Sequence, residues 1–253
     1  MRAHVTHSWL QRCSSARRCV AASAHGASPQ WPAVSLDAYG CILHLAEPVE
    51  DVYLRVAESH GIRGLTREGV KASWRAAFAE PVPPGRLRYE GDGSAFWRRV
   101  VAASTGSTSD ELFLELFAHY GKPGSWIVAP GAHDCLRRVR DRGTKLALLS
   151  NFDNRLRSLL HELELAALFD ELVISAEVGW EKPHPSIFLH AAAALGVPAS
   201  TMLHVGDDPV LDVQGALAAG YGDAWLYGRK AVDGLSSFDA LQERLMHGTR
   251  MHV

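Results

Sequence analysis

The stretch AVSLDAYGCIL, residues 33–43, gives the first indication of the fold. Its first four residues form a short, mostly apolar run, typical of a buried β-strand, and the run ends at Asp37. Further short apolar runs follow much later in the chain, at residues 146–149, 172–174, 202–205 and 224–227. Brief apolar runs of this kind predict five strands that are buried on both faces.

Helical patterns separate the later strands. They occupy residues 132–142, 155–165, 185–195 and 210–219. Gly143 and Gly220 follow the first and the last of them, where helices commonly end. Strands that alternate with helices indicate a parallel sheet covered on both faces. The predicted fold class is therefore α/β, a Rossmann-like, doubly wound parallel sheet.

Residues 46–128 interrupt this alternation directly after the first strand. They contain no convincing strand and predict four helices, at residues 49–60, 67–80, 95–103 and 109–120. Thr108 and Glu111 have the spacing of a capping box before the last of these helices. We expect a helical cap domain at residues 46–128, inserted into a core domain made of residues 31–45 and 129–253.

The composition excludes two classes of partner. The net charge is −2, whereas nucleic-acid binders usually carry a strong basic excess. No run of about 18 apolar residues is present, so no membrane span is predicted. The four cysteines form no CxxC pair, which is typical of a reduced intracellular protein rather than a disulfide scaffold.

The N-terminal segment differs from the rest of the chain. Residues 1–36 contain four arginines and no acidic residue, and they are rich in serine and alanine. This composition is typical of an organellar transit peptide, and the alternative is a disordered extension. We expect residues 1–30 to be such a segment, removed in a plastid or mitochondrion. If the segment is not a transit peptide, the expected location is the cytoplasm.

Polar side chains follow the predicted strands where a parallel sheet binds its ligands, at the carboxyl ends. Asp37 follows the first strand, and Ser150 and Asn151 end the second. The fourth strand leads into GDDPVLD, with Asp207, Asp208 and Asp212, and Lys182 lies in the preceding segment GWEKPHPSIF. Each motif alone is weakly diagnostic, but four motifs in this order form a strong pattern.

These four segments resemble the four ordered motifs of the haloacid dehalogenase superfamily, over about residues 33–228. The runs GSWIVAPGAHDCLRRVRDRGTKLALLSNFDNRL and SAEVGWEKPHPSIF resemble most closely the group of haloacid dehalogenase-like hydrolase domain-containing protein 3. The resemblance implies a Mg²⁺-dependent phosphatase that acts on a small phosphate ester. In such an enzyme Asp37 would attack phosphorus and form an aspartyl-phosphate, which water then hydrolyses.

The resemblance also implies a role for each site residue. Mg²⁺ would be held by Asp37, Asp207 and the backbone carbonyl of Tyr39. Asp212 would be a further ligand or a residue that supports the ligands. The resemblance assigns no role to Asp208. Lys182 would balance negative charge during catalysis. Ser150 and Asn151 would bind the transferring phosphoryl group.

Two residues depart from the superfamily pattern. Tyr39 stands where the phosphatases usually carry a second aspartate, which protonates the leaving group. Loss of such a general acid typically costs about 10²–10⁴-fold in rate. Cys41 stands where the family usually has threonine, and a thiol is a weaker hydrogen-bond donor than a hydroxyl.

Two alternative functions remain open from the sequence. Tyr39 is shared with the 2-haloacid dehalogenases, which attack carbon and need no metal. Asp207, Asp208 and Asp212 argue against that alternative, because carboxylates clustered near Asp37 need a cation to offset their repulsion. The other alternative is a non-catalytic protein that keeps the fold for binding.

Overall fold

The computed structural model describes residues 30–83, 85–228, 231–232 and 235–247. Residues 1–29, which carry the predicted transit peptide, lie outside this description. At the centre is a parallel five-stranded sheet with the strand order β5-β4-β1-β6-β7. Its strands are β1 (Ala33–Leu36), β4 (Lys145–Ser150), β5 (Glu171–Ile174), β6 (Met202–Gly206) and β7 (Asp223–Leu226). The predicted α/β fold with five parallel strands is confirmed.

Successive side chains of the sheet point to opposite faces, as the two-residue period of a strand requires. In β1, Ala33 packs into one apolar cluster, while Val34 and Leu36 pack into another. In β4, Leu146 and Leu148 alternate with Ala147 and Leu149 in the same way. The sheet therefore forms the middle of three layers, and its apolar strands are covered on both sides.

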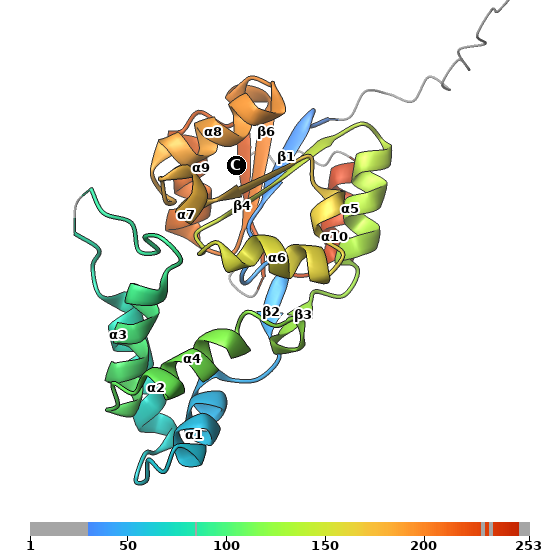
Figure 1. Cartoon of the computed structure of the whole chain (residues 1–253). Helices are drawn as coiled ribbons and strands as arrows, with labels where there is room; N and C mark the ends of the chain where they lie inside the picture. Colours follow the sequence, from blue (N-terminus) through green and yellow to red (C-terminus); the bar gives the residue numbers. More distant parts are fainter. Residues whose placement is uncertain (1–29, 84, 229–230, 233–234, 248–253) are drawn as a thin grey trace, which may run out of the picture.

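The covering helices separate by face. One face is covered by α5 (Ala132–Asp141), α6 (Arg155–Glu162) and α10 (Phe238–His247). The other is covered by α8 (Pro185–Leu195) and α9 (Gly215–Ala218), with the short α7 (Ser175–Val178) beside them (Figure 1). A π-helical turn, η4 (Pro209–Gln214), precedes α9, where the sequence predicted one continuous helix at 210–219. Both α7 and α10 were absent from the sequence prediction.

Four helices, α1–α4, follow β1 in the chain, and we call them together the helical insertion. Its members are α1 (Val49–Ser59), α2 (Arg67–Ala79), α3 (Ser94–Thr105) and α4 (Asp110–His119). Figure 1 shows the insertion beyond the end of the sheet, and it contains apolar clusters of its own. The four helices agree with the sequence prediction. The division of the chain into a cap domain and a core domain stays a prediction.

Two local predictions for the insertion are wrong. A two-stranded antiparallel sheet joins it to the core, formed by β2 (Leu43–Leu45) and β3 (Trp126–Val128). These strands are three residues long, too short for a periodic pattern. They pair with each other, and Leu43 and Trp126 pack into the core. In addition, Ser109 rather than Thr108 caps α4, because its hydroxyl accepts a hydrogen bond from the Leu112 backbone N–H.

Among the described residues, no helix has both the length and the apolar character needed to cross a membrane.

Candidate active site

The topology brings three predicted site residues to one edge of the sheet. Asp37 directly follows β1, Ser150 is the last residue of β4, and Asp207 directly follows β6. Strands β4, β1 and β6 are neighbours and run in the same direction, so their carboxyl ends lie side by side. All three residues line the same cleft, as the sequence predicted.

Three carboxylates converge at this edge. One oxygen from each of Asp37, Asp207 and Asp212 lies within 4.8 Å of the other two. Asp37 and Asp212 are buried, whereas Asp207 is partly exposed. Like charges this close in a buried setting repel strongly unless a cation or a proton offsets them. The donor set is of the kind that a hard divalent cation prefers, since it consists of carboxylate oxygens.

Lys182 is the cation nearest to two of these carboxylates. Its Nζ donates hydrogen bonds of 2.6 Å to Oδ1 of Asp37 and of 2.6 Å to Oδ1 of Asp212. The lysine side chain is only 3% exposed, so the ion pairs are shielded from water. The single positive charge of Lys182 thus contacts two carboxylates directly, and the third carboxylate, of Asp207, lies nearby.

Burial and charge shift the pKa values in this cluster in different directions. Burial raises the pKa of Asp37 to about 7, although Lys182 opposes the shift. For Asp212, burial would raise the pKa, but Lys182 and His204 together bring it well below its ordinary value. Burial would lower the pKa of Lys182, but the two carboxylates raise it overall. The charges at Lys182 and Asp212 are therefore firmly held, whereas burial, with a smaller contribution from Asp212, favours the neutral form of Asp37.

Asp212 is held in place from three directions. Its Oδ1 accepts from Lys182 and lies 3.1 Å from Nε2 of His204, and its Oδ2 accepts from the backbone N–H of Asp208. A carboxylate only accepts hydrogen bonds, so His204 carries its proton on Nε2, and Nδ1 accepts from the Ser35 hydroxyl at 2.8 Å. The sequence analysis assigned no role to His204. Its position inside an apolar strand is a signal that could have identified it.

Two glycines make room for these carboxylates. A Cβ atom at Gly40 would collide with the carboxylate of Asp207, and one at Gly206 would collide with that of Asp212. Gly40 also has a φ of 87°, which disfavours other residues. The backbone therefore approaches the acidic cluster more closely than a side-chain-bearing residue would permit.

Asn151 and Asp208 line the cleft, but the side chain of each forms hydrogen bonds with backbone groups. The Asn151 side chain accepts from the Lys182 N–H at 2.7 Å and donates to the Lys182 carbonyl at 2.9 Å. It therefore fixes the segment that carries Lys182, and its role in binding substrate stays a prediction. Asp208 caps η4, since its Oδ1 accepts from the N–H groups of Val210 and Leu211. It is not part of the carboxylate cluster.

Tyr39 and Cys41 differ in their access to the cleft. The Tyr39 side chain is 49% exposed and lines the cleft, with its ring edge-to-face against Trp126. Burial and the charge of Asp207 raise the pKa of its hydroxyl, which stays neutral. Cys41 is fully buried, and burial raises the pKa of its thiol well above the ordinary value. Neither residue supplies an acidic proton donor near neutral pH.

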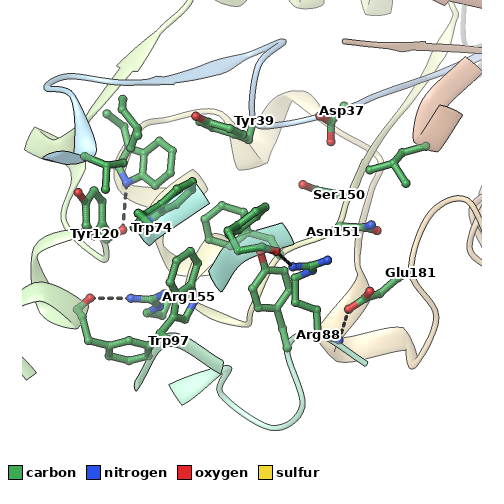
Figure 2. Close-up of a pocket in the computed structure, with 18 of the residues that line it drawn as sticks. Asp37, Tyr39, Trp74, Arg88, Trp97, Tyr120, Ser150, Asn151, Arg155 and Glu181 are labelled. Atoms are coloured by element: carbon green, nitrogen blue, oxygen red, sulfur yellow. Dashed lines mark hydrogen bonds between the residues drawn. The ribbon is translucent and has the colours of Figure 1, made fainter. Parts of the chain in front are cut away.

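The cleft extends from the carboxylates to the helical insertion and has a volume of about 420 Å³. Figure 2 shows Asp37, Ser150 and Asn151 on one side of it and Trp74, Trp97 and Tyr120 on the other. Arg88, Arg155 and Glu181 also line it, and the sequence analysis identified none of the three. Their positions depend on the packing of the insertion against the core, which no local motif encodes.

The chain is similar to known hydrolases. The family model described as haloacid dehalogenase-like hydrolase matches residues 31–220. Human haloacid dehalogenase-like hydrolase domain-containing protein 3 is 30% identical over 207 residues, which cover 78% of this chain and 82% of the relative. A phosphoserine phosphatase of Thermus thermophilus is 41% identical over 98 residues, which cover 38% of this chain and 39% of the relative.

Solved structures show the same fold. A haloacid dehalogenase superfamily phosphatase from Thermococcus onnurineus superposes with a TM-score of 0.60 at 23% identity, covering 87% of this chain and 99% of that chain. The L-2-haloacid dehalogenase of Xanthobacter autotrophicus gives a TM-score of 0.60 at 24% identity, covering 87% and 84%. The family match over most of the chain identifies this protein as a member of the haloacid dehalogenase-like hydrolases.

Proposed function

We propose that this hydrolase is a Mg²⁺-dependent phosphatase that acts on a small phosphate ester through an aspartyl-phosphate at Asp37. The observation that carries the proposal is the cluster of Asp37, Asp207 and Asp212 around a single lysine. Three carboxylates and one ammonium leave a deficit of positive charge, and a phosphate dianion would enlarge it. Phosphatases among the relatives, such as the one from Thermus thermophilus, support the same reaction class.

The proposed reaction has two displacements. A carboxylate oxygen of Asp37 forms a bond to phosphorus while the bond from phosphorus to the ester oxygen breaks and the alcohol or its anion leaves. A water molecule then attacks phosphorus, the bond to Asp37 breaks, and inorganic phosphate leaves with the carboxylate restored. Each displacement replaces one oxygen on phosphorus by another, so no oxidant or reductant is needed.

The residues around Asp37 have distinct proposed roles. Lys182 donates to Asp37 and offsets charge on the transferring group. Ser150, at the end of β4, binds the oxygens of that group. Mg²⁺, held by Asp37, Asp207 and the Tyr39 carbonyl with Asp212 in support, would neutralise the phosphate and orient it for attack. His204 fixes Asp212, and Asn151 fixes the backbone of Lys182.

The helical insertion would act as the cap of this site. It lines the cleft with aromatic side chains, and it is tied to the core by hydrogen bonds from Trp97 Nε1 to Asp153 and from the Arg88 N–H to Glu181. Exclusion of water strengthens the interactions of the charged groups with the substrate. The substrate would therefore be chosen by residues of the insertion, while the core performs the chemistry.

A 2-haloacid dehalogenase is the second candidate. Tyr39 lines the cleft, and dehalogenases are among the proteins of similar fold. In that reaction Asp37 would attack carbon and halide would leave without a proton. The charge deficit of the carboxylate cluster favours the phosphatase, because halide displacement brings no dianion that would require a cation.

The two candidates are separated by one experiment. The protein is incubated with 4-nitrophenyl phosphate or with 2-chloropropionate, each with Mg²⁺ and with EDTA. We expect release of 4-nitrophenol that needs Mg²⁺ and is abolished in Asp37→Asn, and no release of chloride. Capture of beryllium fluoride by the wild type but not by Asp37→Asn would support the aspartyl intermediate. Metal-independent chloride release without phosphatase activity would overturn the proposal.

A further inference from the structure

The two ends of the cleft differ in their side chains. The end at the sheet carries the carboxylates, and the opposite end, at the helical insertion, is lined by aromatic rings. Figure 2 shows Trp74, Trp97 and Tyr120 across the cleft from Asp37 and Ser150. Further rings of the lining come from the insertion at Phe78, Phe113 and Phe117, from β3 at Trp126 and from the core at Phe152. A volume of about 420 Å³ falls within the range of small-molecule sites, roughly 300–1,000 Å³. The space is therefore large enough for an organic group beyond the phosphate.

Several rings of the lining meet one another in pairs, some stacked and some tilted. Trp74 stacks on Phe78 at a centroid distance of 4.8 Å with an angle of 9° between their planes. Tyr89 stacks on Trp97 at 5.9 Å, and Trp126 lies against Phe152 at 5.8 Å with their planes at 57°. Aromatic pairs in such geometries attract each other beyond the effect of the area they bury. A flat ring entering the cleft would find partners of the same kind.

The two arginines at this end already have partners within the protein. Arg155 forms hydrogen bonds of 2.8 and 2.6 Å with the two carboxylate oxygens of Asp153, and its guanidinium lies over the ring of Phe117. Arg88 lies over the ring of Phe78 and its guanidinium donates to the Phe78 carbonyl, while its backbone N–H donates to Glu181. Burial raises the pKa of Glu181, and the charge of Arg88 opposes that shift. Both guanidinium groups are therefore already engaged by groups of the protein.

Few polar atoms at this end are available to a substrate. The Trp97 Nε1 donates to Asp153, and the Trp126 Nε1 donates to the Tyr120 carbonyl. The buried hydroxyl of Tyr120 has no hydrogen-bond partner among the described residues. The many hydroxyls of a sugar would lose their hydrogen bonds to water here without replacement, which disfavours binding.

We propose that the substrate of this site is a phosphate monoester whose organic part is a flat aromatic ring system. The proposal rests on the phosphatase function inferred above. The phosphate lies against Asp37, and the ring occupies the space between the rings of the insertion and those of the core. Specificity comes from stacking and from the burial of apolar area.

The test compares substrates that differ in their organic part. 2-Naphthyl phosphate is an aromatic ester, and acetyl phosphate is a small compound with a better leaving group, so leaving-group chemistry alone favours acetyl phosphate. We expect a KM for 2-naphthyl phosphate at least tenfold below that for acetyl phosphate. Equal KM values, or a lower value for acetyl phosphate, would overturn the aromatic assignment while leaving the phosphatase function in place.

A pair of variants locates the effect. Trp74→Leu removes a ring of the cleft and keeps an apolar side chain, whereas Trp180→Leu removes a tryptophan that is 45% exposed and lies outside the lining. We expect Trp74→Leu to reduce the preference for 2-naphthyl phosphate at least fivefold and Trp180→Leu to preserve it. Phe78→Leu provides a second pocket variant should Trp74→Leu unfold. An equal effect of the cleft and control variants would contradict the proposal.

Binding without turnover separates this inference from the proposed function. Calorimetry with 2-naphthylphosphonate, which cannot be hydrolysed at its carbon–phosphorus bond, measures the pocket alone. If neither phosphate is hydrolysed in an Asp37-dependent manner, the phosphatase function fails. In that case, phosphonate binding that Trp74→Leu weakens still supports an aromatic ligand, and the absence of binding overturns it.

Discussion

Nζ of Lys182 donates a 2.6 Å hydrogen bond to Oδ1 of Asp37, across 145 residues of sequence. The same nitrogen donates to Asp212, so a single lysine joins the residue after β1 to a carboxylate of η4. Both partners of the first contact are almost completely buried. The contact is possible only when the segment before α8 folds back over the carboxyl edge of the sheet.

Removal of the lysine charge should impair the chemistry. In Lys182→Met, Asp37 and Asp212 would remain buried without their cation, so Asp37 would take up a proton and lose its nucleophilic form. We expect kcat to fall by about 10²–10³-fold, the range found when one donor to a developing charge is removed. Steady-state kinetics with 4-nitrophenyl phosphate measures this. The matched control is Lys71→Met, a partly exposed lysine in the insertion that should leave kcat within twofold.

Metal dependence should follow Asp207 rather than Asp208. EDTA should abolish activity and Mg²⁺ should restore it, and Mg²⁺ should raise the Tm because it binds only the folded site. Asp207→Asn should raise the Mg²⁺ concentration needed for half-maximal activity. Asp208→Asn is the control, since asparagine caps helices about as well as aspartate and Asp208 lies outside the carboxylate cluster. Identical Mg²⁺ curves for both variants would contradict the assigned ligand set.

Tyr39 should make the rate sensitive to the leaving group. Its hydroxyl lines the cleft, but its raised pKa makes it a poor proton donor at neutral pH. Esters with acidic leaving groups should therefore be hydrolysed far faster than alkyl phosphates. We expect Tyr39→Asp to increase turnover of alkyl esters more than that of aryl esters. A plot of log kcat/KM against leaving-group pKa tests this, and a flat line for the wild type would argue against it.

Asp153 should hold the insertion to the core. Its fully buried carboxylate pairs with Arg155 and accepts a 2.9 Å hydrogen bond from Nε1 of Trp97 in α3. Asp153→Ala would leave the guanidinium of Arg155 without its carboxylate, and loss of one partner of a buried pair typically costs about 3–5 kcal/mol. We expect a lower free energy of unfolding by urea titration. Asp134→Ala, which removes an exposed partner of Arg137, should change it by less than about 1 kcal/mol.

The N-terminal segment should direct the protein to an organelle. Residues 1–36 lack acidic residues and carry four arginines, which is typical of a transit peptide. A fluorescent reporter fused to residues 1–36 should accumulate in a plastid or mitochondrion. Arg12, Arg17 and Arg18 replaced by glutamate in the same fusion provide the control, since acidic residues are rare in such peptides. A diffuse cytosolic signal from the unmodified fusion would contradict targeting.

The sequence by itself determined the sheet and the edge at which the site forms. Each strand is a local apolar run, and a residue that follows such a run must lie at the carboxyl edge once the strands are parallel. Asp37, Ser150 and Asp207 could therefore be assigned to one edge before any contact was known. The four helices of the insertion were predictable for the same reason, because helical periodicity is a local property.

Only the tertiary structure decided which side chains touch. β2 and β3 are too short to be recognised alone and exist because they pair across more than 80 residues. Asp208 and Asp212 are both aspartates of the segment that follows β6, and no local pattern distinguishes their roles. In the structure Asp208 caps η4, whereas Asp212 pairs with Lys182 and His204. The aromatic end of the cleft also depends on how the insertion packs against the core. These features depend on contacts between distant segments, whose geometry is set by packing of the whole chain rather than by any local pattern.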